Sequence, residues 1–318
     1  MLEVIVVSGG FSKEREVSIN TGNGVYENLD SKKYRKRRVN LWNRKDVIKL
    51  TKEKDSAQFF VFNALHGTFG EDGEFQRLLD EAGVSYTGCG LHASALCMDK
   101  LRAKEVLKTG GIKVPEGLCV SRVDSPELVE RFFEKHKKVV VKPRCEGSSI
   151  GVSIIQRKED LPRALKTAFV YSSDVLVEEF IEGVEITACV MGNSESDLEV
   201  LPVVEIVPVS DTFFSYEAKY TEGGSLHIVP ARLSKTQLNE VVEIAKKAYL
   251  LTKCEVYSRI DMIVGKTGIY VLEINTLPGL TKTSLFPDSA RSLGISYAEL
   301  LDKIISLSLG KFSGLKVV

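Results

Sequence analysis

The amino-acid sequence predicts an α/β protein in which a doubly wound βαβ domain is followed by a two-lobed α+β part. Strand and helix signals alternate over roughly the first ninety residues, which is typical of a parallel sheet with helices on both faces. From about Leu118 the pattern changes to short strands and hairpins with single helices between them. We therefore expect three units, at residues 1–95, 96–181 and 182–318.

The first unit is expected to contain strands at residues 3–8, 38–42 and 59–62 and helices at 17–29 and 73–82. Ligands bind such sheets beyond the carboxyl ends of their strands. Two glycine-rich turns fall at those ends, SGGFSKEREVS and NALHGTFGEDGEF. A helix at 91–107 and the segment TGGIKVPEG then indicate a boundary to the second unit.

The second unit is expected to be a small α+β unit with a helix at 125–136. Its segment VVVKPRCEGSSIGVSII is typical of a strand, a loop of small and hydroxyl residues, and a second strand. Backbone N–H groups of such a loop can close over phosphate oxygens, and Lys142 at the end of the first strand adds a point charge. No GK[ST] opens a helix here, so this is not a Walker loop, and a hairpin with a flexible tip is the alternative interpretation.

Acidic side chains follow the next apolar strand, in the segment DVLVEEFIEGVEI. Glu178, Glu179 and Glu185 lie where carboxylates at a strand end could hold an adenine amino group and ribose hydroxyls. Acidic residues on an ordinary surface would give a similar pattern. The segment alone therefore leaves both interpretations open.

The third unit is expected to contain strands at 185–191 and 198–207, helices at 234–251 and 297–308, and a hairpin between these helices. The hairpin is the segment RIDMIVGKTGIYVLEINTLPG. We predict a three-residue loop, Lys266-Thr267-Gly268, in which glycine takes the left-handed position. Such a loop would set Gly265 opposite Ile269.

That register places Asp261 opposite Glu273 and Arg259 opposite Asn275, all on one face of the hairpin. Two carboxylates that face each other destabilise a sheet unless something neutralises them. Magnesium prefers such oxygen ligands and typically binds one or two carboxylates together with substrate phosphates. We therefore predict a metal site here; the alternative is a solvated edge hairpin whose charges face water.

Composition and charge argue against several classes of function. The 318 residues carry 43 basic and 43 acidic side chains, so no net field favours nucleic acid or an anionic membrane. The start MLEVIVVSGG is expected to be a strand and not a signal peptide, and no apolar run reaches membrane-spanning length. Six scattered cysteines lack a CxxC pair or zinc spacing, so we expect reduced core residues of a cytoplasmic protein.

Three enzyme motifs are also missing from the sequence. The four histidines form no HExxH pair, no serine lies in a GxSxG turn, and SGGFSKER is not the GxGxxG fingerprint of a dinucleotide-binding domain. These observations argue against a zinc hydrolase, a serine hydrolase of that type and a dinucleotide-dependent dehydrogenase.

Taken in order along the chain, the motifs resemble those of the ATP-grasp superfamily and, within it, of the D-alanine:D-alanine ligase family. They are GGFSKEREVS, HGTFGEDG, MDKLRAK, VVKPRCEGSSIGVS, VEEFIEGVEITACV, YEAKYTEGGS, YSRIDMIV and LEINTLPGLTKTSLFP. The resemblance covers essentially the whole chain, and the complete ordered set is very specific. It implies a two-lobed ATP-grasp fold after the N-terminal domain. It also implies ATP-dependent joining of two D-alanines through an acyl phosphate, with release of ADP and phosphate, for peptidoglycan precursor synthesis.

The resemblance further implies how ATP and its metal ions are held. The positions that match the family's nucleotide contacts are Lys100, Lys142 and Lys219 for the phosphates and Glu178, Glu179 and Glu185 for adenine and ribose. Some relatives carry a lysine at the position of Glu179, and this departure is expected to shift the adenine contacts, which run partly through the backbone. The positions that match the ligands of two Mg²⁺ or Mn²⁺ ions are Asp261, Glu273 and Asn275.

Other matches imply roles toward the two amino-acid substrates. Arg259 and the Gly279 N–H match an oxyanion hole, and Ser284 matches the group that binds the second substrate's carboxylate. Glu14 matches the group that holds the first substrate's ammonium and, with Ser148 and Tyr220, forms a hydrogen-bonded trio that closes the site. His66 is expected to position or deprotonate the second amine, or only to structure its turn.

Alternatives remain for the acceptor and for activity itself. Tyr220 argues against D-lactate as the second substrate, whereas nothing in the sequence excludes D-serine. A catalytically silent ATP-binding scaffold is disfavoured because the metal ligands and Arg259 are retained. The loop DTFFSYEAKYTEGGSL is long enough to be a lid that keeps water from an acyl phosphate. By resemblance we also expect a homodimer whose partners are D-alanine and ATP.

Overall fold

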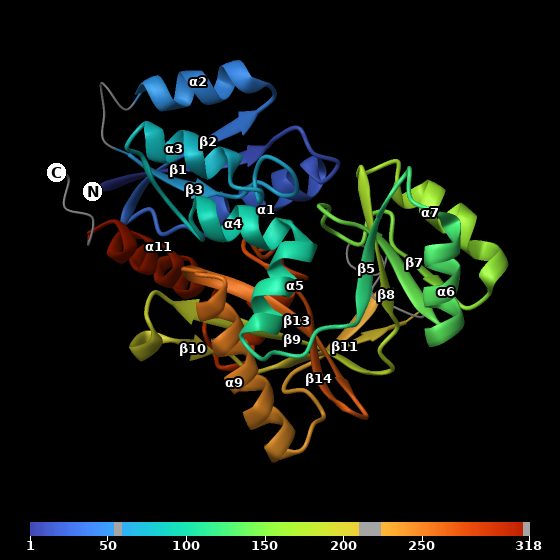
Figure 1. The fold of residues 1–318 in the computed structure, drawn as a ribbon. Coiled ribbons are helices and arrows are strands. Elements are labelled where there is room, and N and C mark those ends of the chain that lie inside the picture. Colours follow the sequence, from blue (N-terminus) through green and yellow to red (C-terminus); the bar gives the residue numbers. More distant parts are fainter. Residues whose placement is uncertain (54–58, 210–223, 314–318) are drawn as a thin grey trace.

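The computed structural model describes residues 1–53, 59–209 and 224–313. Three sheets organise these residues, and they follow one another along the chain from blue to red in Figure 1. Their strands lie at residues 2–86, 117–179 and 183–275. The predicted order, an α/β part before an α+β part, is confirmed, while the unit boundaries at 95/96 and 181/182 stay predictions.

The first sheet is parallel throughout, with the strand order β2-β1-β3-β4. Its strands and helices are β1 (Leu2–Gly9), α1 (Arg15–Asn28), β2 (Tyr34–Leu41), α2 (Arg44–Lys52), β3 (Phe60–Asn63), α3 (Glu74–Glu81) and β4 (Ser85–Tyr86). The side chains at positions 4–7 are fully buried, as expected for a parallel strand that is covered on both faces. The predicted βαβ rhythm is therefore confirmed.

A break at Asp99 divides the predicted helix at 91–107 into α4 (Leu91–Met98) and α5 (Lys100–Thr109). Asp99 has an extended backbone, and its carboxylate accepts a hydrogen bond from the Arg102 N–H of α5 at 3.3 Å. The Arg144 guanidinium binds the same carboxylate through Nε–Oδ1 at 2.8 Å and Nη2–Oδ2 at 2.7 Å. The single-helix prediction was wrong because a partner 45 residues away stabilises this cap.

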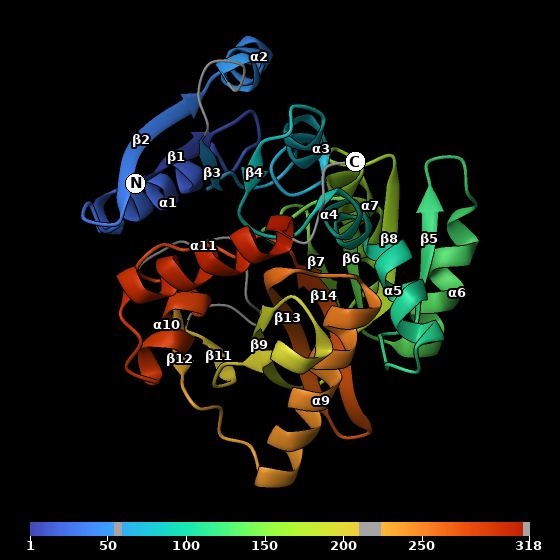
Figure 2. The ribbon, with the colours of Figure 1, turned by 90° about the vertical axis from the view of Figure 1, so that its left-hand side faces the viewer.

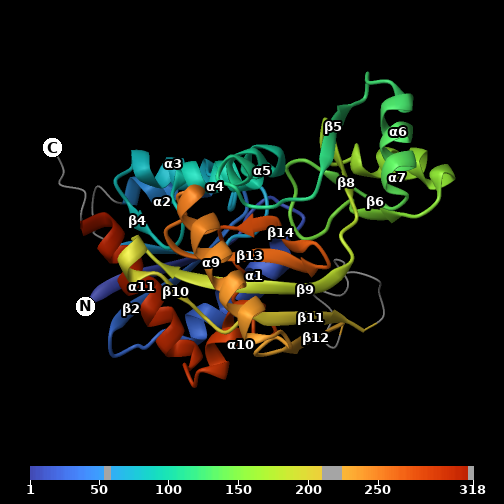
Figure 3. The same ribbon diagram turned by 60° about the horizontal axis from the view of Figure 1, so that its bottom comes forward.

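The second sheet is antiparallel, with the order β5-β8-β6-β7. Its elements are β5 (Gly117–Ser121), α6 (Pro126–His136), β6 (Val139–Pro143), β7 (Ser153–Ile155), the 3₁₀ helix η2 (Lys158–Asp160), α7 (Leu161–Ala168) and β8 (Asp174–Glu179). Helices α6 and α7 pack on its outer face, and this lobe projects to one side of the molecule in Figures 1 and 3. The inner face of the sheet is thus left toward the third sheet.

The third sheet has the order β12-β11-β9-β13-β14, and β10 pairs with β9 beside this path. Its elements are β9 (Gly183–Gly192), the 3₁₀ helix η3 (Glu195–Asp197), β10 (Glu199–Val200), β11 (Val204–Pro208), β12 (Ser225–Ile228), α9 (Lys235–Leu251), β13 (Val256–Gly265), β14 (Gly268–Asn275), α10 (Leu285–Ser292) and α11 (Tyr297–Ser313). The single strand predicted at 198–207 was wrong. Pro202 lies between β10 and β11, and a proline has no N–H to donate to a ladder.

Helix α11 joins the third sheet to the first. Figure 2 shows it between the two, and its Leu301 and Ile304 share one buried cluster with Val4 of β1 and Tyr257 of β13. Helix α9 covers the opposite face of the third sheet. As a result, the turns that follow β1 and β3 lie near the open end of the β13–β14 hairpin, away from its turn.

Two expectations from composition can be compared with the fold. All six cysteines fall within the described ranges, and all are free thiols. Among the helices of residues 1–53, 59–209 and 224–313, none is long and apolar enough to cross a membrane.

Candidate active site

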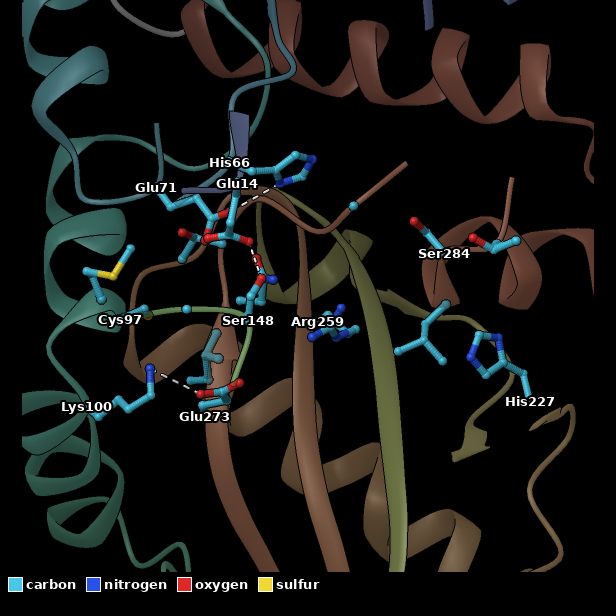
Figure 4. A pocket seen from close by; sticks show the side chains of 18 residues that line it. Glu14, His66, Glu71, Cys97, Lys100, Ser148, His227, Arg259, Glu273 and Ser284 are labelled. Carbon is cyan, nitrogen blue, oxygen red and sulfur yellow. Dashed lines mark hydrogen bonds and ion pairs between the residues drawn. The ribbon is translucent and has the colours of Figure 1, made fainter. Parts of the chain in front are cut away.

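Two adjoining cavities lie where the three sheets meet. The inner cavity, of about 820 Å³, is bordered by the turns after β1 and β3, the ends of β13 and β14, and the start of α10 (Figure 4). The interlobe cavity, of about 1060 Å³, lies between the second and third sheets. Lys100 and Glu273 border both cavities.

The β13–β14 hairpin has the predicted pairs but not the predicted turn. Asp261 lies opposite Glu273 and Arg259 opposite Asn275, which confirms the register at this end. The loop is one residue shorter than predicted, because Gly265 pairs with Gly268. A β-bulge between positions 271 and 273 compensates for the missing residue, since Met262 pairs with Val271 while Asp261 pairs with Glu273. The bulge thus returns the two carboxylates to one pair.

Asp261 is neutralised by an arginine of its own strand. The Arg259 guanidinium donates from Nε to Oδ1 and from Nη2 to Oδ2, each at 2.8 Å, and the Thr187 hydroxyl adds a bond of 2.6 Å to Oδ1. Burial alone would lower the pKa of Arg259, but the charge of Asp261 outweighs it, so the pKa is raised. Arg259 therefore presents a fixed positive charge to the inner cavity.

Glu273 is paired with a lysine from a different element. Lys100, the first residue of α5, has its Nζ 3.2 Å from Glu273 Oε2 and donates to the Glu146 carbonyl at 2.5 Å (Figure 4). The break at Asp99 makes this contact possible, because it starts α5 at Lys100. The ammonium consequently stands at the border between the two cavities.

These ion pairs correct the reasoning that led to a metal site. Arg259 and Lys100 already neutralise the two carboxylates, so a metal ion is not required for that purpose. Within the part of the chain that the structure describes, no cluster of three or more His, Cys, Asp or Glu side chains could hold a metal ion. Two carboxylates with the amide of Asn275 are nevertheless oxygen ligands that suit Mg²⁺ when phosphate oxygens complete the set.

Two lysines hold Glu178 at the wall of the interlobe cavity. Lys142 Nζ is 2.8 Å from Glu178 Oε2, and Lys104 Nζ is bonded to Oε1. Burial alone would raise the pKa of Glu178, but the two lysine charges outweigh it and lower the pKa. For Lys142, too, the attraction of Glu178 and Glu273 outweighs burial and raises the pKa. Glu178 is therefore an ionised acceptor.

The other two predicted acids also border the interlobe cavity. Glu179 accepts a hydrogen bond from the Glu116 N–H at 2.8 Å, so its carboxylate is bound to the backbone of the preceding loop. Its own N–H donates to the Glu116 carbonyl at 2.8 Å. Glu185 lies across the cavity on β9, where it pairs with Ile263.

The glycine-rich turn after β1 meets the loop between β6 and β7. Glu14 is 3% exposed, and the Ser148 hydroxyl donates to its carboxylate (Figure 4). Ser148 and Ser149 have φ of 51° and 58°, a strained conformation for residues with a side chain. Lys219 and Tyr220 were predicted to join this site, but both lie outside the described residues.

His66, Gly279 and Ser284 lie at the far end of the inner cavity. The His66 ring is held at both nitrogens, by Glu71 Oε1 at 3.2 Å and Thr21 Oγ1 at 2.9 Å. A Cβ on Gly279 would lie only 3.0 Å from the Ser284 hydroxyl, so the backbone approaches this side chain closely. Ser284 immediately precedes α10, and its hydroxyl does not cap the helix but lies 2.8 Å from Thr281 Oγ1.

Three polar residues escaped the sequence analysis: Glu71 and His227, which border the inner cavity, and Lys104, which contacts Glu178. Lys104 follows Lys100 by one helical turn, and this i, i+4 spacing is a signal that could have found it. Glu71, the partner of His66, is in the quoted motif HGTFGEDG. His227 borders the inner cavity with its Nδ1 2.7 Å from Asp288, and no local signal in β12 pointed to it.

Comparisons with known proteins agree with this arrangement. Models of the D-ala D-ala ligase N-terminus and C-terminus match residues 35–89 and 106–306. The chain is 40% identical to D-alanine--D-alanine ligase B of Clostridium perfringens, over 98% of this chain and 99% of the relative. It is 41% identical to D-alanine--D-alanine ligase of Carboxydothermus hydrogenoformans, over 97% and 98% of the two chains.

Solved structures extend the likeness to three dimensions. A D-alanine--D-alanine ligase from Bacillus anthracis complexed with ATP is 33% identical, with a TM-score of 0.84 over 99% of this chain and 100% of that chain. The VanG D-Ala:D-Ser ligase from Enterococcus faecalis is 31% identical, with a TM-score of 0.80 over 96% and 99% of the two chains. The predicted ATP-grasp fold is thus confirmed. The chain belongs to the D-alanine–D-alanine ligase family.

Proposed function

We propose that this protein joins two D-alanines to D-alanyl-D-alanine, converts ATP to ADP and phosphate, and supplies peptidoglycan precursor synthesis. One observation carries the proposal: Lys100 and Glu273 border both cavities. A triphosphate in the interlobe cavity would therefore end where a carboxylate in the inner cavity begins. Transfer of a phosphoryl group between two substrates needs this adjacency.

The interlobe cavity is proposed to hold ATP. Lys142 and Lys100 would contact the phosphates, with Lys219 as a further contact to the γ-phosphate. Glu178 would accept a hydrogen bond from the adenine amino group, and Glu185 would bind the ribose hydroxyls. Glu179 would contribute mainly through its backbone, since its carboxylate already accepts a hydrogen bond from the Glu116 N–H. The likeness to a family member solved with ATP supports this assignment.

Asp261, Glu273 and Asn275 are proposed to hold Mg²⁺ or Mn²⁺, with two ions expected. The donor set fits: Asp261 and Glu273 line the interlobe cavity, Asn275 lines the adjoining inner cavity, and phosphate oxygens would complete the coordination. When bound, the ions would neutralise the charge of the triphosphate.

The first D-alanine is proposed to bind in the inner cavity with its ammonium at Glu14. A carboxylate oxygen of this substrate attacks the γ-phosphorus, the bond to the β-phosphate oxygen breaks, and an acyl phosphate and ADP result. Ser148 fixes the carboxylate of Glu14, and Tyr220 would complete this trio. Water exclusion matters here, because water would hydrolyse the acyl phosphate.

The second D-alanine is proposed to bind with its carboxylate at Ser284. Its unprotonated amine attacks the acyl carbon, the carbonyl oxygen becomes an oxyanion, and the carbonyl reforms as phosphate leaves with one proton from the nitrogen. The Arg259 guanidinium and the Gly279 N–H would stabilise that oxyanion. His66 would position the amine, because both ring nitrogens already have protein partners.

D-Serine or D-lactate as the acceptor is the second candidate function. One structural neighbour is named a D-Ala:D-Ser ligase, whereas the relatives near 40% identity are named for D-alanine alone. D-Alanine is therefore the favoured acceptor. A silent scaffold stays disfavoured, since Arg259, Asp261, Glu273 and Asn275 adjoin the cavities. The homodimer stays a prediction that rests on the family, and the cytoplasmic location stays one that rests on the pattern of the cysteines.

The test is phosphate release from ATP and Mg²⁺ with D-alanine, L-alanine, or D-alanine mixed with D-serine or D-lactate, while product masses are recorded. Release with D-alanine alone, together with the mass of the dipeptide, is expected. A dominant mixed product would keep the ligase but change its acceptor. Absence of release with every substrate, despite binding of ATP, would favour the silent scaffold.

A further inference from the structure

Helix α5 presents two lysines, one turn apart, to two different carboxylates. Lys100 contacts Glu273 at the border of the cavities, and Lys104 contacts Glu178 at the wall of the interlobe cavity. Lys104 and Glu178 are 8% and 4% exposed. The proposed chemistry uses Lys100 and Glu178 but gives no role to Lys104.

We propose that Lys104 is a positioning residue that keeps Glu178 ionised and oriented toward adenine while Lys142 turns to the nucleotide phosphates. This inference rests on the proposed function, because it takes the interlobe cavity as the ATP site. Lys104 itself need not touch the nucleotide. It acts on ATP through Glu178.

The geometry of Lys104, Lys142 and Glu178 supports separate roles for the two lysines. Each oxygen of Glu178 has its own ammonium, with Lys104 on Oε1 and Lys142 on Oε2. Two lysines and one glutamate leave one positive charge in excess, which is available to a phosphate. If Lys142 moves to the phosphates, the pair Lys104–Glu178 that stays behind is neutral, and no buried carboxylate is left without a partner.

Without Lys104, this site would have too few positive charges for its anionic groups once ATP is bound. Glu178 and the phosphates would compete for the single ammonium of Lys142. A buried carboxylate that loses its last cation takes up a proton, because burial disfavours its charged form. Loss of Lys104 would therefore change Glu178 from a pure acceptor into a group that can also donate.

That change has a signature in base selectivity. At the position where adenine carries a donating amino group, guanine carries an accepting carbonyl oxygen. An ionised Glu178 accepts from adenine and repels guanine, whereas a protonated one can donate to guanine. Lys104 is thus expected to contribute to the preference for ATP over GTP and not only to affinity.

The pKa of Lys104 is consistent with a role that depends on its charge. Burial lowers the pKa of Lys104 to about 7, and the repulsion of Lys142 adds to this against the attraction of Glu178. Glu178 of β8 and Lys142 of β6 are the charged groups that act on Lys104, and Glu273 of β14 acts on Lys142. Lys104 therefore loses its proton as the pH rises through about 7, and it does so before Lys142.

The experiment compares Lys104→Met and Lys104→Arg with Lys108→Met, an exposed lysine one turn further along α5. Binding of non-hydrolysable adenosine and guanosine triphosphate analogues with Mg²⁺ is measured by calorimetry. Lys104→Met is expected to weaken the adenosine analogue about tenfold or more and the guanosine analogue far less. Lys104→Arg and Lys108→Met should keep the adenine preference of the unchanged protein.

Two results would overturn the inference: unchanged binding of both analogues by Lys104→Met, or an equal loss for both. The second would indicate a role in folding alone. If Lys104→Met does not fold, the pH dependence decides. Affinity for the adenosine analogue should fall between pH 6 and pH 9 in the unchanged protein and stay level in Lys104→Arg, and parallel curves would contradict the inference. Failure of the unchanged protein to bind either analogue would instead refute the proposed function, and this inference with it.

Discussion

Arg259 holds Asp261 with both arms of its guanidinium, at 2.8 Å from Nε to Oδ1 and 2.8 Å from Nη2 to Oδ2. The two residues are separated by one position on β13, so their side chains lie on the same face of the strand. One of them borders the inner cavity and the other the interlobe cavity. This fork therefore links the proposed oxyanion hole to the proposed metal site.

Arg259→Lys should reduce kcat by about a hundredfold or more, because a lysine keeps the charge but not the planar fork aimed at the oxyanion. The measurement is steady-state phosphate release with D-alanine. Arg232→Lys is the control, because Arg232 forms a similar fork with Glu205 away from both cavities. A kcat close to that of the unchanged protein would remove Arg259 from the chemistry.

Glu273→Gln should abolish most turnover and weaken the metal site while it leaves the fold intact. The side chain of Glu273 is 25% exposed, and Lys100 keeps its bond to the Glu146 carbonyl, so a large loss of stability is not expected. Binding of Mn²⁺, followed by electron paramagnetic resonance with a non-hydrolysable ATP analogue, should weaken by about tenfold or more. The control is Glu199→Gln, which breaks a surface ion pair with Lys303. Equal Mn²⁺ binding by both variants would refute the metal assignment.

Local patterns predicted those parts of the molecule whose cause is local. The buried run of β1 and the alternation of side chains along β13 can both be deduced from a few neighbouring residues. The two features predicted from them, the parallel sheet and the pair Asp261–Glu273, are confirmed. The turn of the hairpin was predicted one residue too long. The error did not change the pairing of the carboxylates, because the bulge beside Asp261 compensates for it.

Contacts between distant residues explain what the sequence could not reveal. Helix α5 begins at Lys100 because Arg144 binds Asp99, and Lys104 meets Glu178 across 74 positions. The neutralisation of Glu273 by Lys100 has the same origin, whereas Arg259 and Asp261 are near neighbours on one strand. The contacts of α5 with the second and third sheets depend on tertiary packing, which no periodicity encodes. The roles inferred from the family stay predictions until variants are measured.

Asp99→Asn should destabilise the protein at neutral pH and make no difference in acid. Burial alone would raise the pKa of Asp99, but hydrogen bonding to Arg144 outweighs it and lowers the pKa. The carboxylate therefore adds stability above its unfolded pKa of about 3.9, and this contribution is lost as the pH falls through the lower folded value. We expect a deficit in the free energy of unfolding of about 1–2 kcal/mol at pH 7.

Urea unfolding of Asp99→Asn and the unchanged protein, measured from pH 7 to pH 3, tests this expectation. The curves of unfolding free energy against pH should converge toward the acid end. Arg144→Met serves as the matched variant, because it removes the partner and should show the same convergence. A deficit that stays constant with pH would mean that the cap acts without the charge of Asp99.

Gly279→Ala should raise KM for the second D-alanine and lower kcat while the affinity for ATP is kept. The added Cβ would lie 3.0 Å from the Ser284 hydroxyl and 3.9 Å from His66 Cε1, so Ser284 must shift by a few tenths of an ångström from the position proposed to bind the acceptor carboxylate. A displacement of this kind at a binding group is expected to cost about tenfold in kcat/KM, measured with the first substrate saturating. Gly24→Ala on α1 is the control, because the nearest atom to its added Cβ is 3.6 Å away. Normal kinetics for Gly279→Ala would show that the close approach of this backbone to Ser284 has no part in binding the acceptor.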